Sequence, residues 1–218
     1  MIRRNEIKSP FKTTDWNVVL SFINKWNFYQ QYPARHVSSL YFDTVNLEFH
    51  RLGQEGIVPR DKVRLRWYGL DGFKINHARL EIKRTLYASR EKYSKRYLDV
   101  DSNGAGKIAR LSIYKNYIIT KRIMPVICVT FDRLYFVNPE QSRATIDSNI
   151  KYHKCILTAD NYLTLTQCRS EEFSVLEVKD ESRKAKEMAL KSRLLWSRFS
   201  KYSQAIWSFD SNEVMPER

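Results

Sequence analysis

Several segments of this chain alternate between charged and apolar residues, which is the period of a β-strand. In residues 63–68, Arg64 and Arg66 fall on one face of such a strand, and apolar residues fall on the other. Related alternations occur at residues 4–8, 79–84, 91–97, 143–147 and 176–179. A sheet built from these strands has one apolar face and one face that carries charge on many of its strands.

The chain of 218 residues has 38 Lys and Arg against 24 Asp and Glu, a formal net charge of +14. Such an excess indicates an anionic partner: nucleic acid, an anionic membrane surface or a phosphate-rich small molecule. The cations form no single block of the kind found in disordered nucleic-acid-binding arms, and many lie two residues apart in strand-like segments. Hydrophobic residues, 43% of the chain, suffice for a core, but no apolar run is long enough to cross a membrane.

The periodicity predicts about eight strands and a few helices. We expect helices at residues 15–29, 104–120, 183–198 and 200–207, and a mobile loop at residues 51–60. Strands are expected at residues 5–8, 36–43, 63–68, 78–87, 91–100, 126–137, 143–150, 151–158 and 173–179. Because few helices separate successive strands, we predict one antiparallel, β-dominated α+β domain over residues 1–207, followed by a tail at 208–218.

The charged face uses Arg and Glu-x-Lys pairs where a solvated sheet would use Ser, Thr and Gln. An ordinary antiparallel sheet with one solvent-exposed face explains the alternation in any single strand. An eight-stranded closed tunnel barrel, with a charged interior and an apolar exterior flanked by helices, explains all of them and leaves no sheet edge. Cations in so narrow an interior repel one another unless a polyanion lies among them. We therefore expect a linear, polyphosphate-like ligand and carboxylates that hold a divalent metal.

The chain resembles the vacuolar transporter chaperone (VTC) domain, the polyphosphate polymerase branch of the triphosphate tunnel metalloenzymes. The resemblance covers about residues 3–207 and rests on short motifs in the order expected of that family. They include YFDT at 41–44, KVRLRWYG at 62–69, LEIK at 80–83, RATID at 143–147, LEVK at 176–179 and FSKY at 199–202. The inositol-phosphate-sensing domain and membrane helices of eukaryotic members have no counterpart here, so a stand-alone, prokaryotic-type member is expected.

The resemblance implies an eight-stranded antiparallel tunnel that binds a nucleoside triphosphate and Mn2+ or Mg2+. Polymerase members transfer the γ-phosphate of ATP to a growing polyphosphate chain, whereas related tunnel enzymes hydrolyse triphosphates or cyclise ATP. We expect a cytoplasmic ATP–polyphosphate phosphotransferase with ATP and polyphosphate as partners, no nucleic acid, and no support for a membrane-bound partner. Two alternatives stay open: a triphosphate hydrolase on the same fold, and a non-catalytic module that binds polyphosphate or nucleic acid.

Position by position, the resemblance also implies the site residues. Glu177 would be the metal carboxylate, with Glu6 and Glu81 as further candidates, and Arg64, Arg66, Lys83 and Glu177 would form the catalytic set. The phosphate ligands would be Lys8, Arg64, Arg66, Lys83, Lys95, Arg133, Arg143, Lys179, Ser200 and Lys201. This set suits phosphoryl transfer, which needs positioning and charge stabilisation more than covalent help.

Two aspartates and the cysteines need separate interpretation. Asp43 is expected to end its strand by bonding turn backbone rather than to bind metal. Asp147 could either pair with an arginine or support the metal site. Cys128, Cys155 and Cys168 show no CxxC spacing, so we expect reduced thiols. The cations of residues 183–198 are most simply a solvated helix face, and the alternative is that they guide a product chain or dock on a partner.

Overall fold

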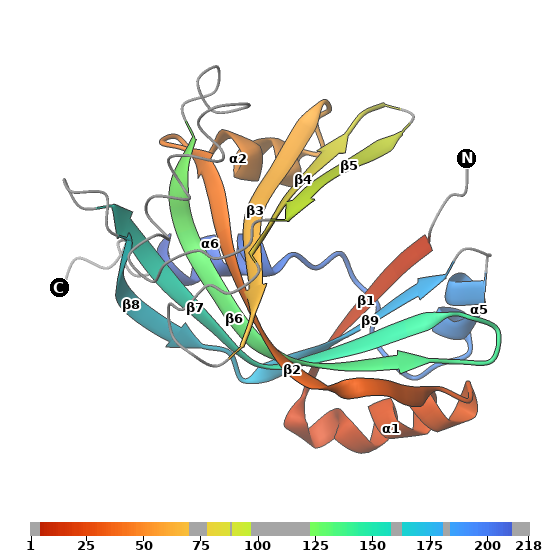
Figure 1. Cartoon of the computed structure of the whole chain (residues 1–218). Helices are drawn as coiled ribbons and strands as arrows, with labels where there is room; N and C mark the ends of the chain where they lie inside the picture. The colour runs from red at the N-terminus through yellow and green to blue at the C-terminus, as the bar shows by residue number, and fades with distance from the viewer. Residues whose placement is uncertain are drawn as a thin grey trace, which may run out of the picture. The chain divides into compact units, whose positions relative to one another are not determined.

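The computed structural model describes residues 5–69, 78–87, 89–96, 123–157, 163–180 and 184–210. The expected helix at 104–120 lies outside these residues, as does the end of the expected tail. Within them the chain is a β-dominated α+β structure, which confirms the predicted fold class (Figure 1).

Within the described residues, nine strands belong to one sheet, in the hydrogen-bonded order β1-β9-β7-β6-β2-β3-β4-β5, with β8 paired to β7. The strands are β1 (Asn5–Lys12), β2 (Tyr29–Thr44), β3 (Arg60–Tyr68), β4 (Arg79–Thr85), β5 (Arg90–Arg96), β6 (Ile123–Val137), β7 (Arg143–Leu157), β8 (Leu163–Ser170) and β9 (Phe173–Asp180). The registers of β1 with β9, β2 with β3, β3 with β4, β4 with β5 and β7 with β9 are all antiparallel.

The sheet differs from the expected eight-stranded closed barrel in two ways. Among the described residues, the strand order is an open path that ends at β1 and β5, so closure is not confirmed. The strand bounds also differ, because β8 was not expected and β7 is one strand where two were expected, at 143–150 and 151–158. Asn149, with its left-handed φ of 51°, lies inside β7, and a polar residue of that kind is a turn signal in sequence.

The described helices are α1 (Trp16–Lys25), α2 (Glu48–Glu55), α5 (Lys184–Leu190) and α6 (Lys201–Asp210), with a 3-10 turn at Thr13–Asp15. None of the helices in this part of the chain is both long enough and apolar enough to pass through a membrane. The expected helix 183–198 is shorter than predicted. Ser192 donates to the carbonyl of Ala189 and accepts the indole N–H of Trp196, and such local bonds compete with a helix.

The expected loop at residues 51–60 is wrong over its first half, which belongs to α2. The carboxylate of Asp43 accepts the backbone N–H groups of Phe49 and His50, and Thr44 Oγ1 accepts that of Glu48. These bonds satisfy the donors that a helix leaves unpaired at its N-terminus. Helix α2 ends at Gly56, whose φ of 73° is readily adopted only without a side chain.

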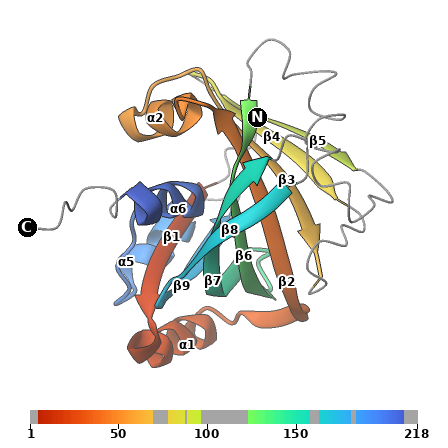
Figure 2. The same ribbon diagram turned by 90° about the vertical axis from the view of Figure 1, so that its left-hand side faces the viewer.

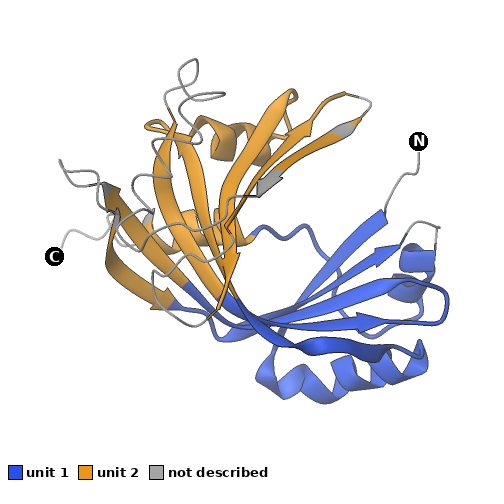
Figure 3. Cartoon of the chain, in the orientation of Figure 1, with its two compact units in different colours: residues 1–36, 131–151, 170–200 blue, residues 37–130, 152–169, 201–218 orange. Residues whose placement is uncertain are grey.

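Contacts divide the chain into two compact units that are discontinuous in sequence (Figure 3). Unit 1 comprises residues 1–36, 131–151 and 170–200, and unit 2 comprises residues 37–130, 152–169 and 201–218. Strands β2, β6, β7 and β8 contribute residues to both. The single domain expected over residues 1–207 stays a prediction.

The core of unit 1 lies between one face of the sheet and helices α1 and α5, which Figures 1 and 2 show beside its strands. Val19, Phe22 and Ile23 of α1 are buried together with Leu176 and Val178 of β9. Alternate residues of the same strands carry the charges, as the sequence pattern predicted. The apolar face is therefore covered and the charged face is left for another role.

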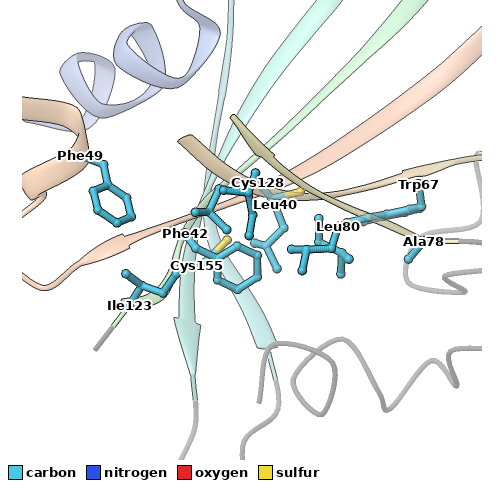
Figure 4. Packing of buried hydrophobic residues seen from close by; sticks show 12 residues of the cluster. Leu40, Phe42, Phe49, Trp67, Ala78, Leu80, Ile123, Cys128 and Cys155 are labelled. Carbon is cyan, nitrogen blue, oxygen red and sulfur yellow. The ribbon is translucent and has the colours of Figure 1, made fainter. Parts of the chain in front are cut away.

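The core of unit 2 is built on the apolar faces of β2, β3 and β4 (Figure 4). Leu40 and Leu65 are fully buried and lie opposite each other in the register of β2 and β3. Phe49 of α2 joins this cluster. Burial of each such side chain contributes roughly 1.5 to 3 kcal/mol, which fixes the strand faces and hence the opposite, charged face.

Candidate functional site

In unit 1, three strands bring charged residues to one face. The register places Glu6 opposite Lys179 and Lys8 opposite Glu177 between β1 and β9. Between β9 and β7 it places Lys179 opposite Arg143. Directly paired residues of a sheet lie on the same face. The predicted phosphate ligands of β1, β7 and β9 thus share a face with Glu177.

Glu177 is the centre of this unit-1 cluster. Its side chain is buried, and Lys179 Nζ lies 2.5 Å from its Oε1. Burial alone would raise the pKa of Glu177, but the charges of Lys179, Lys8 and Arg133 lower this pKa well below its ordinary value. The carboxylate is therefore anionic at neutral pH and is surrounded by three cations.

Lys8 connects Glu177 to a second carboxylate and to the segment before Ser200. Its Nζ lies 2.9 Å from Glu6 Oε1 and donates to the carbonyl of Phe199 at 3.2 Å. Burial and the charge of Glu177 raise the pKa of Glu6, but Lys8 and Lys179 lower it further, so the net shift is downward. Two ionised carboxylates therefore share this cluster with two lysines.

Arg133 of β6 reaches the cluster through Asp147 of β7. Its Nε and Nη2 donate to the two carboxylate oxygens of Asp147 at 2.5 and 2.7 Å, and Asp147 is fully buried. Burial lowers the pKa of Arg133, but Asp147 and Glu177 raise it more, so this guanidinium stays charged. Of the two interpretations of Asp147, pairing with an arginine is confirmed.

A divalent metal in this cluster would draw on the carboxylates of Glu177 and Glu6. Among the described residues no three His, Cys, Asp or Glu side chains gather into a complete metal site. Mg2+-type ions need only one or two protein carboxylates when phosphate oxygens and water complete the shell. Thr145 lies opposite Glu177, and its Oγ1 is buried with no hydrogen-bond partner in the described part of the chain. Glu177, Glu6 and this hydroxyl fit such a partial site.

Unit 2 presents a second charged face, on β3, β4 and β5. Arg64 lies opposite Glu81, with Arg64 Nη2 at 2.6 Å from Glu81 Oε2. Lys92 Nζ lies 2.8 Å from the other oxygen, Oε1. Burial would raise the pKa of Glu81, but Arg64, Lys92 and Arg66 lower it well below its ordinary value. Glu81 is therefore committed to cations on both of its oxygens, which leaves it a poorer metal ligand than Glu177.

The registers of these strands define a cationic grid around Glu81. Cross-strand pairing aligns three rows of three residues, and seven of the nine are Lys or Arg. Like charges directly opposite one another destabilise a sheet, so the grid favours a bound polyanion. The rows are Lys62, Lys83 and Lys92; Arg64, Glu81 and Ser94; and Arg66, Arg79 and Arg96.

An aromatic pair borders this grid. The Tyr41 and Tyr202 rings stack at 5.1 Å, and Lys62 Nζ lies 5.1 Å from the Tyr41 ring centroid. Arg64 Nη1 donates to Tyr41 Oη at 3.4 Å. Burial would raise the pKa of Tyr41, but Lys62, Arg64 and Arg66 together lower it to about 7. At neutral pH this buried side chain is therefore partly ionised, and its phenolate offsets part of the positive charge of the grid.

The predicted ligands thus divide between the units. Unit 1 holds Lys8, Glu177 and Lys179 on its charged face, together with the Arg133–Asp147 pair. Ser200 also belongs to unit 1 and directly follows Phe199, whose carbonyl accepts from Lys8. Unit 2 holds Arg64, Arg66, Lys83 and Glu81 on the grid, and Lys201 as the first residue of α6. Lys95 is paired with Leu80 of the apolar core, while its neighbour Ser94 is paired with Glu81.

Sequence reasoning missed Lys62, Arg79 and Lys92. The expectation counted alternation along residues 91–97 without the register of β5 against β4. That register is closed by the turn in which Leu86 N–H donates to the Ser89 carbonyl at 2.8 Å. Pairing residues outward from this turn would have placed Lys92 opposite Lys83, on the face that carries Glu81.

A comparison with models of known protein families identifies the family of this chain. The model of the VTC domain matches residues 4–209. The chain belongs to the VTC domain family. Among curated proteins, none matches this VTC chain.

Solved structures are similar to this VTC chain at low sequence identity. PH1819 from Pyrococcus horikoshii OT3 is 11% identical at a TM-score of 0.54, over 94% of this chain and 99% of that one. HpAC1 from Hippeastrum, a protein with a dominant triphosphatase activity, is 11% identical at a TM-score of 0.49, over 97% and 98%. The inorganic triphosphatase NE1496 is 11% identical at a TM-score of 0.39, over 94% and 96%. The likeness to PH1819 supports the fold alone.

Proposed function

We propose that this VTC chain is a metal-dependent polyphosphate polymerase that transfers the γ-phosphate of ATP to a growing polyphosphate chain. Membership of the VTC family supports the proposal. The observation that carries it is the surrounding of one buried carboxylate, Glu177, by the cations of Lys8, Lys179 and Arg133. A closed tunnel, as the family resemblance implies, is part of the proposal.

The cations of unit 1 would hold the triphosphate. Lys8 and Lys179 supply point charges, and Arg133 supplies a planar guanidinium that Asp147 fixes in orientation. Such preset charges stabilise the negative oxygens of phosphoryl transfer without reorganising during the reaction. Glu177 and Glu6 would hold Mn2+ or Mg2+ together with phosphate oxygens. When bound, the metal supplies charge neutralisation at those oxygens.

The paired state of the carboxylates favours a phosphate acceptor over water. Glu6 and Glu177 each lie within ion-pair distance of a lysine, and Asp147 is held by Arg133. A terminal phosphate oxygen of polyphosphate is already anionic and can attack the γ-phosphorus without a protein base. The new P–O bond forms as the bond from the γ-phosphorus to the bridging oxygen breaks, and ADP leaves with that electron pair.

The grid of unit 2 would bind further phosphates. Arg64 and Arg66 lie two residues apart on the same face of β3, so their positive charges can stabilise successive phosphates of one chain. Lys83 is exposed on the same face and carries the third predicted contact. We propose these three residues as phosphate ligands, because the family resemblance implies each of them and the register of β3 with β4 places all three on one face of the sheet.

The test is product analysis after incubation of the purified protein with ATP and Mn2+. A ladder of long phosphate chains on a gel, with ADP released, is expected. Orthophosphate alone would support the hydrolase instead, and no turnover of ATP or tripolyphosphate would support a non-catalytic binding module. Glu177→Gln should abolish the ladder. Glu172→Gln, an exposed carboxylate in the turn before β9, is the matched control and should leave it intact.

A further inference from the structure

An aromatic and cationic cluster lies in unit 1 beside the predicted phosphate site. Tyr32 of β2 and Tyr135 of β6 meet edge to face, with ring centroids 6.0 Å apart at 82°. The guanidinium of Arg35 lies 5.6 Å from the Tyr32 ring and 5.8 Å from the Tyr135 ring. Two rings and one planar cation are therefore gathered from two strands.

This cluster is continuous with the cations around Glu177. The guanidinium carbon of Arg133 lies 6.0 Å from the centroid of the Tyr135 ring. Arg133 is also the arginine whose charge lowers the pKa of Glu177. Side chains thus connect the phosphate-binding cations, through Tyr135, to Tyr32 and Arg35.

The cluster is also accessible. Tyr32 is 46% exposed, and Arg35 is exposed as well. An inorganic phosphate chain has no apolar surface and gains nothing from a tyrosine ring. A nucleobase presents a flat π-face, which stacks on tyrosine rings and on the guanidinium plane of arginine. An exposed ring beside a phosphate site suits a ligand that has a base at one end and phosphates at the other.

We propose that Tyr32, Tyr135 and Arg35 form a stacking site for the base of a nucleoside triphosphate whose phosphates reach Arg133. The proposal rests on the proposed function of the same site and adds to it the reason for using a nucleotide as donor. The cluster gives the chain a preference for nucleoside triphosphate over inorganic triphosphate, because only the nucleotide can contact the rings.

The test compares two ligands on one set of variants. ATP and inorganic tripolyphosphate are each titrated into the protein in a calorimeter, with a chelator present so that no turnover occurs. Loss of a stacked ring weakens base binding by roughly 5- to 100-fold. Tyr32→Ala should therefore weaken the affinity for ATP by that factor and leave the affinity for tripolyphosphate unchanged within about twofold. Tyr32→Phe keeps the ring and should bind ATP like the unaltered chain.

Tyr29→Ala is the matched control, since Tyr29 is 54% exposed on the same strand and belongs to no part of the cluster described above. It should change neither affinity. If Tyr32→Ala leaves ATP binding unchanged, or weakens both ligands equally, the stacking site is wrong. Equal binding of ATP and tripolyphosphate by the unaltered chain would also overturn it. The proposed function fails separately, when the unaltered chain turns over neither ligand with Mn2+.

Discussion

Tyr202 Oη donates a 2.6 Å hydrogen bond to Asp43 Oδ2, so within unit 2 the first turn of α6 is tied to the end of β2. The same fully buried carboxylate accepts three backbone N–H groups, from Thr44, Phe49 and His50, at 2.7, 2.9 and 2.9 Å. One side chain therefore fixes the strand end, the start of α2 and the start of α6. The YFDT and FSKY motifs meet at this bond.

Replacement of Asp43 should destabilise the fold strongly. Asp43→Ala leaves four donors without their acceptor, and each buried unpaired group costs about 1 to 3 kcal/mol. We expect the free energy of unfolding, measured by urea denaturation, to fall by about 3 kcal/mol or more. Tyr202→Phe removes only one donor and should cost about 1 kcal/mol. Equal losses in the two variants would contradict the central place of Asp43.

The titration of Tyr41 gives a pH prediction. Its pKa in the folded chain is about 7, against about 10 for an unfolded tyrosine. Between these values the unfolded state binds more protons, so stability should rise with pH, by up to about 1.4 kcal/mol per unit. Urea denaturation from pH 7 to 9 should show this rise, and Tyr41→Phe should remove it. Tyr87→Phe, at an 89% exposed position, should keep it.

Much of the fold could be predicted from strand parity, and the reason is local. The faces of β3 and β9 follow from alternation alone, so Leu65 is buried while Arg64 lies on the charged face. Register is not local, because it depends on which residues of two strands pair. Lys95 and Lys92 illustrate this: both suit an exposed strand position in sequence, but only the pairing of β4 with β5 places Lys92 beside Glu81.

Helix α2 was missed for a related reason. Its sequence contains Gly53 and is followed by Gly56 and Pro59, which are loop signals in isolation. Its first turn is held by Asp43, a residue outside the helix, so tertiary contact overrides weak propensity. The sequence did predict that Asp43 bonds backbone after its strand, and the Thr44 hydroxyl that accepts the Glu48 N–H is a second polar signal there.

Neutralisation of Glu177 should separate phosphate binding from turnover. Glu177→Gln removes the anion that Lys8, Lys179 and Arg133 surround, so these cations become more available to phosphate. We expect metal-free affinity for tripolyphosphate to rise about fivefold, equivalent to roughly 1 kcal/mol. Turnover with Mn2+ should fall by more than about 100-fold, since even residues that only support a metal ligand contribute about 10- to 100-fold. A fall in both quantities would argue that Glu177 only maintains the fold.

Lys92 and Lys95 offer a direct test of the grid, because they lie three residues apart on the same strand. Lys92→Ala removes a cation that contacts Glu81 on the charged face, whereas Lys95 is paired with Leu80 of the core. Removing a cation that binds phosphate should weaken the binding of long-chain polyphosphate and flatten its salt dependence. We expect Lys92→Ala to weaken polyphosphate binding by about 5- to 10-fold at low salt, and Lys95→Ala by less than about twofold. The two affinities are measured by fluorescence competition with labelled polyphosphate. A larger loss in Lys95→Ala than in Lys92→Ala would show that Lys95, as the family resemblance implied, and not Lys92, binds phosphate.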